Sequence, residues 1–500
     1  MNILSTKIGN QNASPKFPNA RNNTTLFVLR LTVMVSVLAI SITAGFFISM
    51  NVYLYFGGAL GLFLIYQTIL RWPWLAFAAF VVLSMVGRVP SGLGIIAIYL
   101  SMGFLMVFTI ASVWLFQMFI VHRRIEIHPN RAVFAAISLG AVAILAFIAG
   151  YLPWFPIEGA DIEAQITGLG IFVISVFAFL LGAHHVKVQK HLEITVYIYL
   201  LMGAALIVGS LIPALQGSVY RLYLAGARGS MLWNWLAALA FGQALINTQL
   251  KWRWRFLLFA FVGLLFFVSL GQYRSWVSGW LPPLAAVGMI IWLRVEKLRV
   301  FIVAFGIMAI IYFMQTPYWR QLVAENAYSL LTRGATYGVI FEIVKVNPIL
   351  GLGPSNYYWY TPLYAILGWY VQFNSHNQYV DIIAQTGLLG LGMVFWFAWE
   401  MLKNSVRGTR ELPHGFARAY SYSVYGGLIG MLVSGMLGDW FIPFVYNIGV
   451  RGTSATLLGW FFLGGVIALD AIHRAPVEAD LHPTETQLAK QAQRPIFPVS

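Results

Sequence analysis

Long apolar runs follow one another along most of the chain, each bounded by charged residues, Pro or Asn. Many of them reach the length of about 20 residues that a helix needs to cross the hydrocarbon core of a bilayer. They lie near residues 26–49, 52–70, 73–87, 93–121, 131–153, 166–183, 194–213, 230–250, 256–271, 280–293, 300–315, 380–402, 420–438 and 450–470. The runs 73–87 and 280–293 fall short of the usual minimum of about 17 residues. The pattern therefore predicts an all-α polytopic membrane protein with about 12–14 transmembrane helices.

The composition agrees with an integral membrane protein. Hydrophobic residues make up 60% of the 500 residues and charged residues only 9%, with a mean hydropathy of +0.77. A soluble domain carries about a quarter charged residues. The formal net charge of +15 lies mostly in the short loops between spans, where the positive-inside bias accounts for it without nucleic acid. The chain has no cysteine, which excludes disulfides, thiolate nucleophiles and Cys-ligated metals.

The basic clusters orient the chain. If the segment 1–25 is cytoplasmic, every strong cluster of Lys and Arg falls on the cytoplasmic side. We therefore predict that both termini are cytoplasmic, with spans 1 to 11 in residues 26–315, an extracytoplasmic loop in 316–379, spans 12 to 14 in 380–470 and a disordered cytoplasmic tail in 471–500. A few cations fall on the extracytoplasmic side, where the positive-inside bias does not explain them. They are Arg88, Arg221, Arg228, Arg274, Arg320, Arg333, Lys345 and Arg451.

The loop 316–379 is much longer than an ordinary connection, and such loops are usually functional or disordered. It is too rich in Tyr and Trp to be disordered. The sequence predicts that it packs at the membrane surface with short helices, one of them over 332–346, which ends before the Asn347-Pro348 break.

Three motifs stand in and after this loop. They are Arg333-Gly-Ala-Thr-Tyr-Gly, then Asn347-Pro-Ile-Leu-Gly351-Leu-Gly353-Pro-Ser-Asn356, then Ser375-His376-Asn377-Gln378 leading into Gln385-Thr-Gly387-Leu-Leu-Gly390. In this order they resemble the C-terminal signature of the O-antigen ligase and O-antigen polymerase superfamily, which are membrane glycosyltransferases of the GT-C type. A further point of resemblance is Gln272-Tyr273-Arg274-Ser275-Trp276, in the place of the family's Ser-Arg-Gly turn.

The resemblance implies an enzyme of cell-surface polysaccharide biosynthesis in the plasma (inner) membrane. Its donor would be an undecaprenyl-diphosphate-linked glycan on the outer face, and its acceptor hydroxyl would belong to a glycan, to the lipid A-core of lipopolysaccharide or to a protein. The motifs are shared by ligases and polymerases and do not choose between them. Tyr273 and Ser275 depart from the family's turn, and Gln385 stands where the family often has an acidic residue, so the role of that carboxylate does not transfer.

The residue types suit this chemistry independently of the resemblance. Glycosyl transfer from a lipid diphosphate needs negative charge stabilised on the departing diphosphate, and Arg makes bidentate contacts to phosphate while staying ionised. We assign Arg274 and Arg333 as catalytic in this sense, and Arg221 and Arg228 as substrate-binding. Carboxylates on the outer side are few and scattered, so we expect no metal site and no cofactor, with arginine in place of a metal.

His376 is the candidate for positioning or deprotonating the acceptor hydroxyl, because imidazole titrates near neutral pH. Asn377 and Gln378 are expected to bind sugar hydroxyls. Gly351 and Gly353 are expected to allow a close backbone approach and to present N–H groups to an anion.

Other interpretations compete with these. A loop histidine is often structural, interfacial arginines often meet lipid headgroups, and His184-His185 is expected to be a solvated cytoplasmic pair. At the level of the whole protein, the alternatives are a secondary transporter or lipid-linked glycan flippase, or a membrane scaffold without catalysis. Transporters place ionisable residues and broken helices at the bilayer midplane, whereas here the polar residues gather in an outer loop.

Overall fold

The computed structural model describes residues 73–88, 101–125 and 127–481. The predicted segment 1–25, the predicted spans 26–49 and 52–70 and the start of the run 93–121 lie outside the described residues. Where the chain is described it is helical, and the bridges Arg88–Ser101 and Ile366–Trp369 are its only extended pairings.

The long helices coincide with the apolar runs, except for α13, which lies in the predicted loop 316–379. They are α3 (Pro73–Val86), α4 (Met102–Phe116), α5 (Arg131–Ala149), α6 (Ile162–His185), α7 (Gln189–Leu211), α9 (Ser230–Ile246), α10 (Trp252–Gly271), α11 (Val277–Arg294), α12 (Arg299–Gln315), α13 (Pro317–Val344), α15 (Gln378–Glu411), α16 (Phe416–Leu437) and α17 (Gly449–Leu481). Among the described residues, eight helices are long and apolar enough to cross a membrane. The predicted fold class, an all-α polytopic membrane protein, is confirmed.

Short elements connect the long helices. They are η2 (Gln117–Val121), α8 (Pro213–Leu222), η3 (Gly226–Arg228), η4 (Glu296–Leu298), α14 (Tyr357–Tyr360) and η5 (Thr361–Leu363).

One predicted helix boundary is wrong, and α17 extends past the predicted start of the tail. The helix expected over 332–346 begins at Pro317, where the side chain of Thr316 accepts a hydrogen bond from the N–H of Trp319 and caps the first turn. The tail expected to be disordered from residue 471 continues α17 to Leu481. Asp470 supports this extension because it pairs with Arg474 one turn later and with Arg407 of α15.

Backbone contact between glycines holds α6 against α17. A Cβ on Gly182 would lie 2.2 Å from the carbonyl oxygen of Phe461, and one on Gly464 would lie 2.1 Å from that of Phe179. Membrane helices associate through small residues that let their backbones approach closely, because lipid provides no hydrophobic drive for helix pairing. These glycines therefore set the distance between the two helices.

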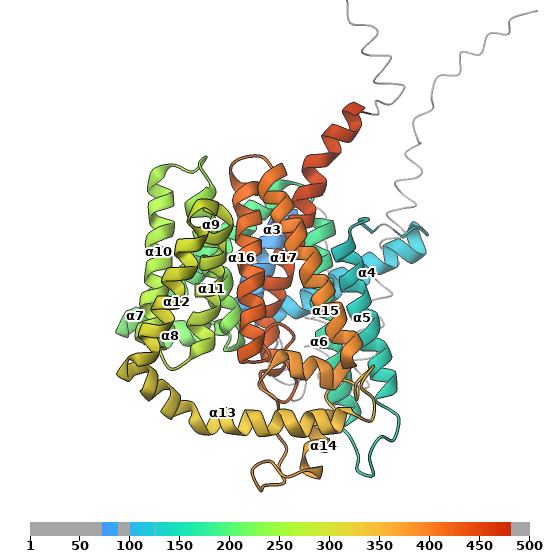
Figure 1. The fold of residues 1–500 in the computed structure, drawn as a ribbon. Helices are drawn as coiled ribbons and strands as arrows, with labels where there is room; N and C mark the ends of the chain where they lie inside the picture. Colours follow the sequence, from blue (N-terminus) through green and yellow to red (C-terminus); the bar gives the residue numbers. More distant parts are fainter. Residues whose placement is uncertain (1–72, 89–100, 126, 482–500) are drawn as a thin grey trace, which may run out of the picture. The chain divides into compact units, whose positions relative to one another are not determined.

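Helix α13 runs across the ends of the spanning helices, as Figure 1 shows. Its C-terminal half packs into an apolar cluster with the following loop and with α15. The buried members of this cluster are Val339, Ile340, Ile343, Val344, Leu352, Tyr357, Tyr360, Ile366, Val380, Ala384 and Phe444. We refer to this side of the bundle as the α13 end.

Helix α15 is broken at Gly387, which has φ 69° and ψ −172°. The break frees backbone groups that need partners inside a membrane protein. Residues 347–353 supply them: Leu352 and Gly353 donate their N–H groups to the carbonyls of Ala384 (2.9 Å) and Gln385 (3.1 Å). In the other direction, Leu388 and Leu389 donate to the carbonyls of Pro348 (2.9 Å) and Ile349 (3.2 Å). Residues 347–353 thus complete the backbone hydrogen bonding of α15 at the break.

We predict that Gly387→Ala destabilises the protein strongly. The added Cβ would lie 2.0 Å from the carbonyl oxygen of Ile349, in a backbone conformation that costs alanine about 1–3 kcal/mol by itself. The control is Gly392→Ala in the same helix, where no atom lies within 4 Å of the added Cβ. Thermal unfolding in detergent should show a lower Tm for Gly387→Ala only, and equal Tm values for the two variants would contradict this account of the break.

Candidate functional site

The glycines of the second motif serve the break in α15. Gly351 has φ +70°, and a Cβ there would lie 2.6 Å from the amide nitrogen of Gly387. Gly353 has φ +85° and packs against Gly150 of α5. The close backbone approach expected from the sequence is present, but it is made to protein. Because the N–H of Gly351 bonds the carbonyl of Asn347 and that of Gly353 bonds Gln385, neither is available to an anion.

His376 stands at the end of the loop, two residues before α15 begins. Its backbone has a positive φ of 50°, which a residue other than glycine rarely adopts. The half-buried ring contacts Phe373 edge to face at 5.7 Å, and its Nδ1 lies 3.3 Å from Nδ2 of Asn447. Burial and the nearby positive charge of Arg333 lower the pKa of His376 to about 4. His376 is therefore neutral at pH 7.

A buried acid organises the chain around His376. Asp381, one turn into α15, accepts hydrogen bonds from the hydroxyls of Tyr357 and Ser375. Ser375 Oγ in turn accepts from the N–H of Asn377 at 2.9 Å. This network fixes both neighbours of His376, and it explains how the strained conformation at residue 376 is maintained.

Asn377 and Gln378 form part of the scaffold. Asn377 caps α15, because its side chain accepts from the N–H groups of Tyr379 and Val380. Gln378 is fully buried and binds the segment before α17: its amide accepts from the N–H groups of Phe441 and Ile442 and donates to the carbonyl of Ile442 at 2.8 Å. The structure gives both side chains structural contacts, and their expected role in binding sugars stays a prediction.

The segment held by Gln378 carries a second buried acid. Asp439 accepts from the N–H of Phe444 at 2.6 Å and from the side-chain amide of Asn447. Burial raises the pKa of Asp439 to about 6, so the carboxylate is ionised at pH 7. Asn447 thus lies between Asp439 and His376.

Arg333 reaches this site from α13. It is half-buried, its positive charge acts on His376, and its buried Nε has no hydrogen-bond partner in the structure. A buried cationic donor that lacks a partner suits an anionic ligand. Arg333 and His376, predicted from separate motifs, are therefore close together.

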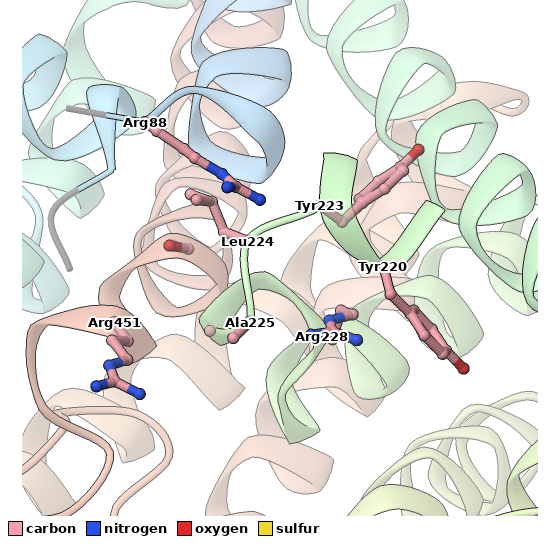
Figure 2. Close-up of a pocket in the computed structure, with 9 residues that line it drawn as sticks. Arg88, Tyr220, Tyr223, Leu224, Ala225, Arg228 and Arg451 are labelled. Carbon is pink, nitrogen blue, oxygen red and sulfur yellow. The ribbon is translucent and has the colours of Figure 1, made fainter. Parts of the chain in front are cut away.

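A cavity of about 250 Å³ lies between α3, η3 and α17 (Figure 2). It is lined by three arginines from three segments: Arg88 after α3, Arg228 at the end of η3 and Arg451 in the first turn of α17. Arg228 stacks on the ring of Tyr220 at 4.7 Å, and its buried Nε is without a hydrogen bond. Ser454, also at the cavity, is buried with an unpartnered Oγ. The lining is suited to an anion.

Arg274 occupies an exposed turn between α10 and α11. The turn is connected to the arginine-lined cavity by its neighbour Tyr273, whose hydroxyl is hydrogen-bonded to that of Tyr220. On the side of His376, the ring of Trp276 lies 5.9 Å from the ring of Trp440. Trp440 follows Asp439 in the chain. The aromatic neighbours of Arg274 thus contact the segments of Tyr220 and Trp440.

Arg221 differs from the other predicted arginines. Its guanidinium is exposed and reaches Ser218 at 3.4 Å, while its carbonyl accepts a hydrogen bond from Arg88. Arg221 does not line the cavity, so its contribution there is to hold Arg88 through its backbone.

Several residues of the site were not singled out from the sequence: Asn447, Asp439, Tyr357, Ser375, Asp381 and Ser454. Their positions depend on contacts between residues far apart in the chain. The signal for Arg88 and Arg451 was their place among the cations that topology does not require, but nothing in the sequence joined them to Arg228.

The histidine pair His184-His185 is not solvated as expected. It ends α6, and His184 is buried between the rings of Trp114 (5.0 Å) and His128 (4.7 Å). Its Nε2 accepts from the N–H of His128. In the part of the chain that the structure describes, no group of three or more His, Asp or Glu side chains is placed to hold a metal ion.

We predict that Gln378→Ala lowers the Tm of the purified protein. It leaves two N–H groups and a carbonyl of 441–442 without partners, and each buried orphan costs about 1–3 kcal/mol. Gln372→Ala, which truncates an exposed glutamine in the loop, is the control and should leave the Tm unchanged. An unaltered Tm for Gln378→Ala, together with weaker substrate binding, would return Gln378 to a sugar-binding role.

The site lies largely within a segment that is similar to a known family. Residues 274–395 match the family model described as O-Antigen ligase. No curated protein matches the chain. In general terms, the match supports an O-antigen ligase-type function, which is a glycosyltransferase-like activity on lipid-linked glycans, in a multi-pass membrane protein. Over residues 274–395 the chain is thus similar to the O-antigen ligases, and its resemblance to the O-antigen ligase and polymerase superfamily is confirmed.

Proposed function

We propose that this protein transfers a glycan from an undecaprenyl-diphosphate carrier to an acceptor hydroxyl at the outer face of the plasma membrane. The observation that carries the proposal is the match of residues 274–395 to the O-antigen ligases, a segment that contains both His376 and Arg333, whose positive charge acts on His376. In this reaction the acceptor oxygen forms a bond to the anomeric carbon while the bond from that carbon to the diphosphate breaks. Direct displacement of this kind inverts the anomeric centre.

The arginines would stabilise the departing diphosphate. Preorganised positive charge at developing negative charge is often the largest contribution to catalysis. Arg333 meets this need at the His376 site, and Arg274 lies in the turn that joins this site to the cavity of Arg88, Arg228 and Arg451. A diphosphate between these groups would be bound without a metal ion.

His376 would act on the reacting oxygens. It is neutral at pH 7 and held in one backbone conformation by its neighbours. Either of two roles fits this state: a base for the acceptor hydroxyl, or a group that positions a substrate oxygen.

One observation favours a second candidate, a transporter of lipid-linked glycan. Broken helices next to ionisable residues often mark transport sites, and α15 is broken at Gly387, less than two turns from Asp381. Here, however, the backbone groups of the break bond residues 347–353, and Asp381 is engaged by two hydroxyls. The break is therefore filled with protein rather than arranged around a substrate.

We expect Arg333→Lys and His376→Ala to fail in different ways. The lysine variant keeps the charge but loses the bidentate fork, so binding of the undecaprenyl-diphosphate glycan should weaken. If His376 is a base, the alanine variant should bind the undecaprenyl-diphosphate glycan normally, while its turnover falls by about 10²–10⁴-fold. Arg320→Lys, an exposed position on the same helix, is the control and should behave like the unmodified protein.

The measurement is transfer to an added acceptor in the presence of a chelator, with equilibrium binding of the donor followed separately. Full activity of His376→Ala in folded protein would remove this residue from the reaction. Loss of activity on adding the chelator would overturn the metal-free mechanism.

A further inference from the structure

The two ring nitrogens of His376 have different surroundings, because Nδ1 faces the side-chain amide of Asn447. The amide nitrogen Nδ2 of Asn447 lies 3.3 Å from Nδ1 of His376. The same Nδ2 also bonds Oδ1 of Asp439. An amide NH₂ group has two protons to donate, so it can serve both partners at once.

Asp439 determines which end of the Asn447 amide faces it. The carboxylate is buried, is ionised at pH 7 and already accepts from the N–H of Phe444. An ionised carboxylate only accepts hydrogen bonds, so the atom of Asn447 that contacts it must be the NH₂ nitrogen and not the carbonyl oxygen. The hydrogen bond to Asp439 therefore fixes the orientation of the Asn447 amide.

This orientation determines the tautomer of His376. An NH₂ group is a donor, so the ring nitrogen that it faces must be the acceptor, without a proton. A proton on Nδ1, in the other neutral tautomer or in the imidazolium ion, would bring two N–H groups against each other. The proton of the neutral ring then lies on Nε2.

We propose that Asn447, held by Asp439, is the positioning residue that keeps His376 in the Nε2–H tautomer, so that His376 acts as a hydrogen-bond donor to a diphosphate oxygen of the substrate. This inference rests on the proposed function for the identity of the substrate. It decides between the two roles of His376 in favour of positioning, because a nitrogen that already carries a proton does not act as a base.

The charges around His376 support a diphosphate oxygen as the acceptor of this hydrogen bond. Arg333 is a second donor near the ring, and its buried Nε is unpartnered. A diphosphate anion accepts hydrogen bonds from both groups, and these bonds are stronger than the bonds that a neutral sugar hydroxyl accepts from the same two donors. His376 and Arg333 thus form one donor pair.

The proton of the reaction is accounted for without His376. The acceptor hydroxyl loses its proton as its oxygen bonds the anomeric carbon, and the departing diphosphate gains a free terminal oxygen. Phosphate monoesters have an ionisation near pH 6, so the departing group can take up this proton near neutral pH. His376 keeps its own proton throughout.

Substitution of His376 separates a donor from a base. The amide of glutamine can place an N–H near the position of Nε2 but has no basic nitrogen. We expect His376→Gln to retain transfer within about 10-fold of the unmodified protein, whereas His376→Ala, which lacks the donor, should lose about 10²–10³-fold. If glutamine is as inactive as alanine while the Tm values of both variants are unchanged, the donor role is overturned.

The tautomer can be measured without any transfer assay. Long-range ¹H–¹⁵N spectra of ¹⁵N-histidine-labelled protein should show an unprotonated Nδ1 and a protonated Nε2 for the signal that disappears in His376→Gln. Asn447→Leu, which removes the amide, should change these two ¹⁵N shifts. His414→Gln, at an exposed histidine on another loop, removes a different signal and serves as the assignment control.

The two readouts can fail independently. A protonated Nδ1 in the unmodified protein, or shifts that do not respond to Asn447→Leu, would overturn the role of Asn447 whatever the reaction is. Correct shifts in a protein that transfers no glycan would instead contradict the proposed function and leave the tautomer assignment in place.

Discussion

The structure of the site depends on the backbone hydrogen bonds that residues 347–353 make to α15 where Gly387 breaks that helix. Backbone groups inside a membrane protein need partners, and here residues 347–353 supply them in both directions. This loop follows α13 directly, so the exchange of hydrogen bonds ties α13 to the N-terminal part of α15. That tie brings Arg333 of α13 close to His376, which stands just before α15.

The polar groups of the site fall into two sets. One set consists of acids and amides that bond to one another and to backbone, such as Asp381 with Tyr357 and Gln378 with residues 441–442. These groups fix the chain on both sides of His376. The other set consists of arginines with buried donor atoms that lack a partner, as Arg333 and Arg228 have at Nε. The first set is structural, and the second has the capacity to bind an anion.

The sequence predicts the fold class because hydrophobicity alone determines which segments span a bilayer. It also predicts that Arg333, His376 and the glycines belong to one region, through their shared motifs. It could not predict what the glycines contact, because Gly351 and Gly387 meet only in the folded chain. For the same reason the sequence could not predict the structural contacts of Gln378, since its partners at 441–442 lie more than sixty residues away.

Charge patterns gave an incomplete account of the cations. Arg88, Arg228 and Arg451 all belong to the cations that the predicted topology does not require, yet their convergence around one cavity depends on the tertiary structure. The start of α13 was missed because the stretch 317–331 mixes polar and apolar residues, so only the capping side chain of Thr316 and Pro317 mark it.

The central claim is that this protein makes a glycosidic bond rather than moving an intact lipid-linked glycan. The most direct test reconstitutes the unmodified protein in liposomes with an undecaprenyl-diphosphate glycan and an acceptor, and then quantifies the products. We expect one molecule of free undecaprenyl diphosphate to appear for each glycan joined to the acceptor. Donor that crosses the bilayer with its glycan still attached, and no glycosylated acceptor, would contradict it.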